Sequence, residues 1–463
     1  MITDPQLSPG DFSGPLRRLF QTAAAKCAAL ETGWDQDAGA PVFTINGKYA
    51  ARGWTQWTDG FHYGLSILAF DATGDRKLLD QARRNIVTRM SDHLTHMGVH
   101  DHAFNNLSTY GNLRRLIREG RIEHHEWELN FYELAIKTSG AVQAARWARS
   151  ADGGGYIYSF NGPHSLFIDT MRTVRILGLA HTLGQTLLAE NDLRVSLLSR
   201  LIQHGQTTAR YNIYYGQGRD SYDVPALRGR TAHEAIFNPT DGQFRCPSSQ
   251  QGYSARTTWT RGLAWAILGF AEQLEFLGQI SEGDFTSAGV SKSECLAVFE
   301  NAARATADFY VGQAAAADGV PYWDTGAPGL VNLGDWKTRP ADPFSDHEPV
   351  DSSAAAIAAQ GLIRLGRYLG TAGKSYLDAG LTIARTLLAD PYLCTDQHHQ
   401  GLLLHSVYHR PNGWDYIPPG AKIPRGESSM WGDYHLLELG VLIARMSEGR
   451  YLTFFDSPSN AAS

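Results

Sequence analysis

One carboxylate interrupts a strongly apolar stretch of the sequence. In "SLFIDTMRTVRILGLA", Asp169 follows Phe167 and Ile168, and apolar residues then continue at helical spacing. An aspartate can open a helix by accepting hydrogen bonds from the amides of its first turn, or it can pair with Arg172 or Thr173 on the same helix face. The chemical alternative is a catalytic carboxylate in a cleft, where apolar surroundings raise its pKa towards the range that is useful for proton transfer.

Further residues that could do chemistry stand just ahead of apolar segments. They occur in "WTDGFHYG", "GVHDHAFNN", "AHEAIFNP", "QQGYS", "TTWTRGLAW", "PVDSSAAAIA" and "SSMWGDYHLLE". Their structural interpretations are a turn residue for Asp101, a hydrogen-bonded histidine for His233, N-caps for Asp351 and Asp433, and core positions for Trp57 and Trp259. Their shared placement favours a single pocket of acids, aromatics and one arginine.

The elements that must position these residues are pairs of helices. Helical periodicity recurs over residues 58–94, 165–205, 261–312 and 351–390, and each stretch is interrupted by a turn that contains glycine. In each pair the first helix is apolar and rich in small residues, while the second is amphipathic. Buried inner helices followed by half-exposed outer helices predict an all-α fold with a double ring. Strand-like alternation is nearly absent, and the polar residues ahead of the inner helices would meet at one end of the ring.

Length, charge and cysteine content narrow the class of protein. The 463 residues carry a net charge of −6, and no hinge-like or charged run divides them. We therefore expect one domain over residues 1–463, with a less regular segment over about residues 1–50. No basic stripe, long apolar stretch or export signal is found, so we expect neither a nucleic-acid nor a membrane partner. The scattered cysteines favour a reducing compartment, the cytoplasm, and no metal site.

The order of the motifs carries a resemblance to a known family. "HDHAF" is followed by "FIDTM", then by "AHEAIFNP", "QGYS" and "TWTRGLAW", and then by "DSSAAAIAA" and "MWGDY". This order resembles the unsaturated glucuronyl hydrolases of glycoside hydrolase family 88, and it is more distantly similar to the unsaturated rhamnogalacturonyl hydrolases. The resemblance covers most of the chain and implies an (α/α)6 barrel. The chain departs from the family pattern at Ala103, where members usually carry glycine, and over residues 211–231, which look like an insertion.

The resemblance also implies roles for individual residues. It implies that Asp101 and Asp169 are the catalytic-site aspartates, and that the substrate-binding residues are His233, Gln251, Trp259, Arg261 and Trp57. It implies no metal and no organic cofactor. The implied partner is an acidic oligosaccharide that a lyase has left with a 4,5-unsaturated uronic acid at its non-reducing end. The oligomeric state stays open.

The implied reaction is hydration of the vinyl ether that the C4=C5 bond forms with the ring oxygen. Asp169 would protonate C4 and water would add at C5, after which the ring opens and the aglycone leaves. Asp101 would help to keep Asp169 protonated, and Arg261 would bind the substrate carboxylate bidentately. His233 and Gln251 would orient water and ring oxygens.

Trp57 and Trp259 would stack on the faces of sugar rings.

A polysaccharide lyase or a sugar epimerase on the same helical fold is the alternative function. A lyase needs a base beside a group that neutralises the uronate carboxylate, which His233 and Arg261 could supply, whereas an epimerase needs two opposed bases.

Overall fold

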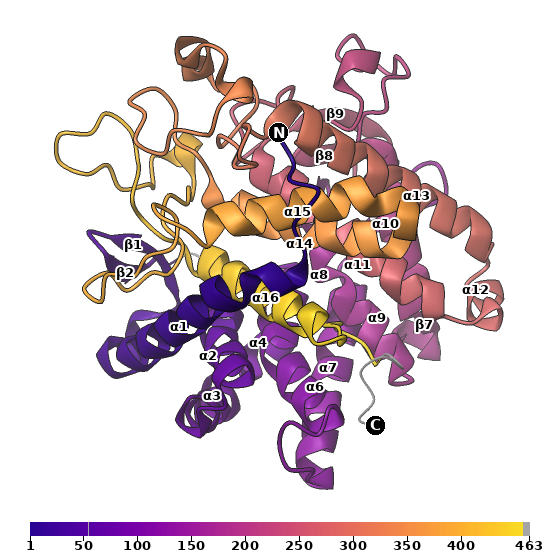
Figure 1. The fold of residues 1–463 in the computed structure, drawn as a ribbon. Helices are drawn as coiled ribbons and strands as arrows, with labels where there is room; N and C mark the ends of the chain where they lie inside the picture. The colour runs from indigo at the N-terminus through magenta and orange to yellow at the C-terminus, as the bar shows by residue number, and fades with distance from the viewer. Residues whose placement is uncertain (54, 457–463) are drawn as a thin grey trace.

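The computed structural model describes residues 1–53 and 55–456, and it consists mainly of helices (Figure 1). Contacts between these helices arrange them in two concentric rings. The inner ring comprises α2 (Asp59–Thr73), α5 with α6 (His102–Asn106 and Asn112–Arg118), α8 with α9 (Thr170–Thr173 and Arg175–Thr182), α11 (Thr260–Gln279), α14 (Ser352–Leu369) and α16 (Met430–Ser447). Successive inner helices contact one another, and α16 contacts α2, which closes the ring. The predicted all-α double ring is confirmed.

The outer ring is formed by the amphipathic helices, each of which precedes an inner helix. Its members are α1 (Ser13–Gly33), α3 (Arg76–Arg89), α7 (Glu126–Ala145), α10 (Leu197–Tyr211), α13 (Lys292–Phe309) and α15 (Lys374–Leu387). Two short helices, α4 (Ser91–Leu94) and α12 (Glu282–Ser287), lie in the connections. The prediction of a less regular segment over about residues 1–50 is wrong, because α1 packs against α2 and α16 as an outer helix (Figure 1).

Small residues allow the inner helices to approach closely. A Cβ at Gly60 of α2 would lie 2.2 Å from the backbone of Asn105 in α5, and a Cβ at Gly361 of α14 would lie 2.7 Å from the backbone of Leu268 in α11. Side chains larger than hydrogen would force these helices apart. The enrichment of small residues in the first helix of each predicted pair therefore reflects helix contact within the ring.

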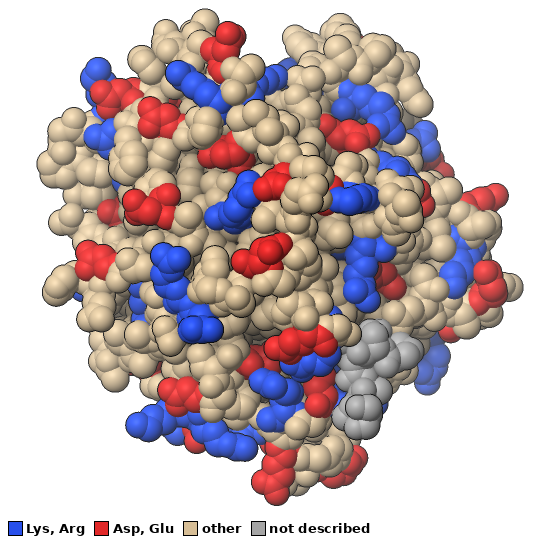
Figure 2. Space-filling model, viewed as in Figure 1, with Lys and Arg blue, Asp and Glu red and all other residues tan. Residues whose placement is uncertain are grey.

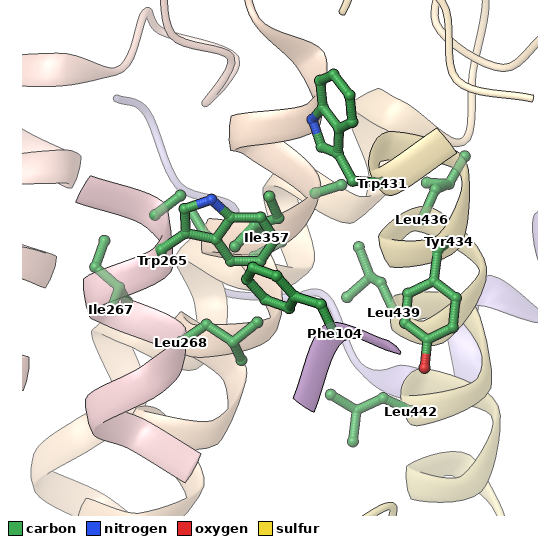
Figure 3. Packing of buried hydrophobic residues seen from close by; sticks show 14 of the residues in the cluster. Phe104, Trp265, Ile267, Leu268, Ile357, Trp431, Tyr434, Leu436, Leu439 and Leu442 are labelled. Carbon is green, nitrogen blue, oxygen red and sulfur yellow. The ribbon is translucent and has the colours of Figure 1, made fainter. Parts of the chain in front are cut away.

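Large apolar side chains fill the interior of the inner ring. Phe104 from α5 and Trp265 from α11 point towards each other (Figure 3), and their ring centroids are 4.9 Å apart. Ile357 from α14 lies beside Trp265, while Trp431 and Tyr434 enter from α16. Burial of these side chains stabilises the closed ring and gives it a solid interior.

Short strands, which the sequence did not predict, lie in the connections between the helices. They form the hairpins β1 (Pro41–Ile45) with β2 (Lys48–Ala51), β3 (Trp147–Arg149) with β4 (Gly155–Ile157) and β6 (Thr186–Leu188) with β7 (Arg194–Ser196), and the three-stranded antiparallel sheet of β5 (Ser165–Phe167), β8 (Glu234–Phe237) and β9 (Phe244–Ser248). Such strands are too short to show a clear alternation of polar and apolar residues.

The surface carries both charge signs without a large patch of either on the face that Figure 2 shows. Lys and Arg side chains stand beside Asp and Glu side chains over that face. Among the described residues, none of the helices combines the length and the apolar character needed to span a membrane.

Candidate active site

A cavity opens at the end of the ring where the inner helices begin. Its lining residues are Thr55, Trp57, His100, Asp101, Phe104, Phe160, Asp169, Gln250, Gln251, Trp259, Arg261, Trp265, Tyr408, His409 and Trp414, around a space of about 550 Å³ that includes solvent at its mouth. His233 lies directly behind the backbone of Gln250 and Gln251. The structure therefore brings seven predicted residues together at one end of the ring, namely Trp57, Asp101, Asp169, His233, Gln251, Trp259 and Arg261.

The three-stranded sheet positions one side of this cavity. Phe167 of β5 pairs with Glu234 of β8, and Glu234 pairs with Ser248 of β9. The Ile168 amide then donates to the His233 carbonyl oxygen over 2.9 Å, which extends the pairing by one step. The end of β5, the start of β8 and the end of β9 therefore lie next to one another. Asp169 and Gln251 come shortly after β5 and β9, and His233 immediately precedes β8.

The Asp169 carboxylate makes none of the structural contacts that the sequence allowed. Asp169 occupies the N-cap position of α8, but its side chain accepts no capping hydrogen bond. Arg172 pairs instead with Glu272 and Glu438, at 3.1 and 2.7 Å, and the Thr173 hydroxyl donates within its own helix. Asp169 is 7% exposed, and its Oδ1 atom has no hydrogen-bond partner among the described residues. A buried carboxylate oxygen without a hydrogen-bond partner is typical of a functional group.

His100 stands between the two aspartates, and it is not among the predicted site residues. Its Nε2 atom lies 3.5 Å from Asp169 Oδ1 and 3.9 Å from Asp101 Oδ1. Asp101 occupies the N-cap position of α5 and, like Asp169, accepts no capping hydrogen bond. The available signal was the position of His100, immediately before Asp101 in "HDHAF".

The pKa values of the aspartates differ from the sequence-based expectation. Burial is the largest influence on the pKa of both carboxyl groups. It raises the pKa of Asp101, the charge of His100 lowers this pKa, and the charge of Asp169 raises it further. At Asp169, burial is outweighed by contact with His100 and by the charge of His100, so the pKa lies below its ordinary value. The prediction that apolar neighbours raise the pKa of Asp169 is wrong, because it did not include His100.

His233 is held as a neutral hydrogen-bond donor. Its Nδ1 atom accepts from the backbone amides of Gln250 and Gln251, at 3.1 and 3.3 Å. Burial lowers the pKa of His233 to about 4. The hydrogen-bond network therefore assigns the remaining proton to Nε2. This N–H group is buried without a hydrogen-bond partner in the described chain, so it can donate to a bound molecule.

Arg261, for which a bidentate contact with a substrate carboxylate was predicted, is bound by other groups of the protein. Nη1 donates to Asp351 Oδ2 over 2.9 Å and to the Val407 carbonyl oxygen over 2.5 Å. Nη2 donates to Gln251 Oε1 over 2.7 Å and to the Tyr408 carbonyl oxygen over 2.8 Å. Both terminal nitrogens are therefore engaged by the protein. Arg261 instead fixes the amide orientation of Gln251 and joins it to the segment around residues 407–408.

The two predicted sugar-stacking tryptophans have different surroundings. Trp57 is half-buried, lines the cavity and stacks on Trp431, with ring centroids 5.0 Å apart. Trp259 is only 2% exposed. Its ring packs against the His233 ring and the Arg261 guanidinium, each 4.6 Å from its centroid. Trp259 therefore supports binding residues, and its predicted stacking on a sugar face is not supported by this packing.

The two other aspartates ahead of inner helices are structural. Asp351 caps α14 by accepting from the amides of Ser353 and Ala354, as predicted. Asp433 is not an N-cap, because Ser429 occupies that position in α16. Its carboxylate instead accepts from the Tyr49 hydroxyl and from the amides of Leu402 and Leu403.

One wall of the cavity comes from a loop that contains none of the predicted site residues. Tyr408, His409 and Trp414 line the cavity. Asp415 fixes this loop by accepting from the amides of Tyr408 and His409, at 2.5 and 3.0 Å. The loop follows no helical or strand period, so only its aromatic content could have pointed to it. Over residues 1–53 and 55–456, no cluster of three His, Cys, Asp or Glu side chains is suited to hold a metal ion.

The chain is similar in sequence to proteins of known function. None of the protein-family models matches. Unsaturated glucuronyl hydrolase from Formosa agariphila is 26% identical over 389 residues, which is 82% of this chain and 78% of that protein. Unsaturated chondroitin disaccharide hydrolase from Streptococcus pyogenes is 26% identical over 424 residues, which is 85% of this chain and 83% of that protein.

A solved structure extends the comparison to the fold. The crystal structure of unsaturated glucuronyl hydrolase from Bacillus sp. GL1 is 21% identical in sequence, and its TM-score with this chain is 0.71. The match covers 96% of this chain and 100% of that chain. In sequence over most of its length, and in fold, the chain therefore resembles the unsaturated glucuronyl hydrolases, as its motifs predicted.

Proposed function

We propose that this protein is a glycoside hydrolase that removes 4,5-unsaturated uronic acid from the non-reducing end of acidic oligosaccharides produced by lyases. The names of the curated relatives support this substrate class. The observation that carries the proposal is the Asp169 carboxylate, which is buried at the cavity, with its Oδ1 atom unpartnered within the described chain and 3.5 Å from His100 Nε2. Such a group is available for proton transfer to a bound molecule.

The substrate's own chemistry defines what Asp169 must do. The C4=C5 bond and the ring oxygen form a vinyl ether, so a proton added to C4 leaves positive charge at C5 that the ring oxygen shares. Asp169 donates that proton, and its carboxylate then accepts a proton from the water that attacks C5. The product at C5 is a hemiketal, which opens and releases the aglycone. One carboxylate thus serves as acid and then as base.

The neighbouring residues bind and orient the sugar. Asp101 has a raised pKa and can exchange hydrogen bonds with ring hydroxyls. The Nε2–H group of His233 donates to a substrate or water oxygen. Gln251 uses its carbonyl oxygen for Arg261, so its amide N–H groups remain for substrate oxygens. Trp57 presents an indole at the cavity for the apolar face of a sugar ring.

Loss of ultraviolet absorbance tests the proposal. The conjugated C4=C5 bond absorbs, and hydration destroys it. A panel of lyase-generated unsaturated disaccharides incubated with the protein should lose this absorbance. An increase with intact polysaccharide would show a lyase, and no change with any substrate would leave an epimerase or a binding protein.

The cytoplasm is the compartment that we propose. The four cysteines, Cys27, Cys246, Cys295 and Cys394, are all free thiols in the structure. Free thiols persist where the surroundings are reducing. Fractionation of the source cells, followed by activity assays, would test this placement, and activity confined to the medium would contradict it.

A further inference from the structure

His100 is a buried residue at the cavity that has no role in the reaction steps described above. It is 1% exposed, and neither of its ring nitrogens has a hydrogen-bond partner among the described residues. Its ring stacks on Phe160, with centroids 6.0 Å apart, and meets Phe167 edge-on at 5.6 Å. Buried imidazoles normally form hydrogen bonds, so an imidazole that is fixed by aromatic packing and left unpaired needs an explanation.

We propose that His100 is the proton reservoir of Asp169: as an imidazolium, it holds the proton that Asp169 delivers to the substrate. This inference rests on the proposed function. The geometry supports it because His100 Nε2 and Asp169 Oδ1 are 3.5 Å apart and both lack other hydrogen-bond partners in the described chain. His100 acts through Asp169 and is therefore a positioning residue.

The proton transfers balance over one turnover. The N–H bond at His100 Nε2 breaks as an O–H bond forms on Asp169. That O–H bond breaks as the C4–H bond of the product forms. The attacking water bonds to C5 and gives one proton to the Asp169 carboxylate, and this proton returns to His100. The net change is the addition of one water molecule to the substrate.

The charges around His100 favour a proton on this residue. The titratable and charged groups that influence it are Asp101, Asp169, Arg146, His204 and His233. Burial lowers the pKa values of His204 and His233 to about 3 and about 4, so both are neutral at neutral pH. Arg146 opposes protonation, but the two aspartates outweigh both Arg146 and burial, and the pKa of His100 lies above its ordinary value.

Histidine NMR tests the reservoir without any assay of activity. In protein labelled with nitrogen-15 at histidine, the signal that disappears in His100→Gln identifies His100. We expect an imidazolium spectrum for His100 in the wild type at about pH 6.5, and a lower His100 pKa in Asp169→Asn, because the anionic partner is removed. A neutral His100 at this pH, or the same pKa in Asp169→Asn, would overturn the inference.

The pH profile of kcat/KM tests the same idea in turnover. With His100→Gln the required proton must reside on Asp169 itself, so the basic limb should move to lower pH by roughly one unit or more. His102→Gln is the matched control, because both His102 nitrogens are already engaged, by Ser139 Oγ at 2.9 Å and the His96 carbonyl oxygen at 3.2 Å. Its basic limb should stay in place.

The possible outcomes separate the reservoir from the proposed function. An unmoved basic limb in a folded His100→Gln protein would contradict the reservoir. Absence of hydration by the wild type would contradict the proposed function. If His100→Gln does not fold, His100→Asn identifies the NMR signal, and the comparison of wild type with Asp169→Asn decides.

Discussion

Arg261 and Asp351 form an ion pair of 2.9 Å in which the two side chains are 2% and 0% exposed. The pair joins the start of α11 to the cap of α14, and the same guanidinium holds Gln251 and two backbone carbonyl groups. A single buried arginine therefore organises one wall of the cavity. Its charge is neutralised within the protein, so its main contribution is geometric.

Replacing Arg261 with lysine should lower stability as well as activity. Lysine keeps the charge, but its single ammonium cannot reach all four acceptors that Arg261 engages. We expect the free energy of unfolding to fall by about 2–4 kcal/mol and kcat/KM to fall about tenfold or more, because Gln251 loses its partner. Urea unfolding and absorbance kinetics measure the two effects. A large rise in KM with unchanged stability would show that Arg261 binds the substrate carboxylate after all.

Asp169→Asn should leave the fold intact and nearly abolish turnover. Oδ1 of Asp169 has no hydrogen-bond partner in the described chain, and an amide has nearly the same shape as the carboxylate, so the fold should be retained. Loss of both proton donation and water activation should lower kcat by roughly three orders of magnitude or more. Asp351→Asn is the contrasting variant, because it breaks the ion pair with Arg261 and should destabilise the protein. More than about a tenth of wild-type rate in Asp169→Asn would remove Asp169 from the reaction.

Stability should fall on mild acidification, partly through His233. Its pKa is about 4 in the folded protein and about 6.5 in an unfolded chain, so the unfolded state binds more protons between these values. This contribution is fully present above about pH 6.5 and is lost as the pH falls towards 4, with an upper limit of about 3 kcal/mol.

A His233→Gln variant isolates this contribution to the pH dependence. Glutamine can still accept from the amides of Gln250 and Gln251 but does not titrate. Urea unfolding between pH 4.5 and 7 should therefore show a shallower pH dependence than in the wild type, by up to one proton. An identical dependence would mean that His233 is not held neutral in the folded protein.

Alanine substitutions of Trp57 and Trp259 should have different effects, the first mainly on substrate binding and the second mainly on stability. Trp57→Ala should raise KM with little change in stability, because Trp57 is half-buried at the cavity. Trp259→Ala should lower the free energy of unfolding by about 3 kcal/mol or more, because a buried indole is lost and its neighbours His233 and Arg261 lose their packing. Thermal unfolding with Michaelis–Menten kinetics compares them. Equal effects of the two changes on stability would contradict this division.

Isotopes should locate the site of water attack. If the vinyl ether is hydrated, heavy-oxygen water places its label at C5 of the released uronate, and deuterated water adds deuterium at C4. A saturated glucuronide with the same aglycone should not be cleaved, because it has no C4=C5 bond. Label at C1, with cleavage of the saturated analogue, would instead show a conventional glycosidase that uses Asp101 and Asp169 as its carboxylate pair. Mass spectrometry and NMR of the product distinguish these outcomes.

The sequence by itself determined the helical architecture and the location of the site. Apolar, small-residue helices must be buried, and amphipathic helices must cover them, so periodicity alone predicted the two rings. Polar residues ahead of inner helices, such as Asp101 and Arg261, had to meet at one end of such a ring. The order of the motifs added the family resemblance.

Only the tertiary structure decided how the site residues are partnered. Arg261 is neutralised by Asp351 and by carbonyl groups near residue 407, and these contacts join segments that are far apart in the chain. The role of His100 could not be predicted, because a linear sequence does not show that its ring nitrogen faces both aspartates. The pKa of Asp169 depends on that contact more than on its apolar neighbours in the chain. Local sequence determines helices through short-range periodicity, whereas charge and hydrogen bonding within a cavity depend on long-range packing.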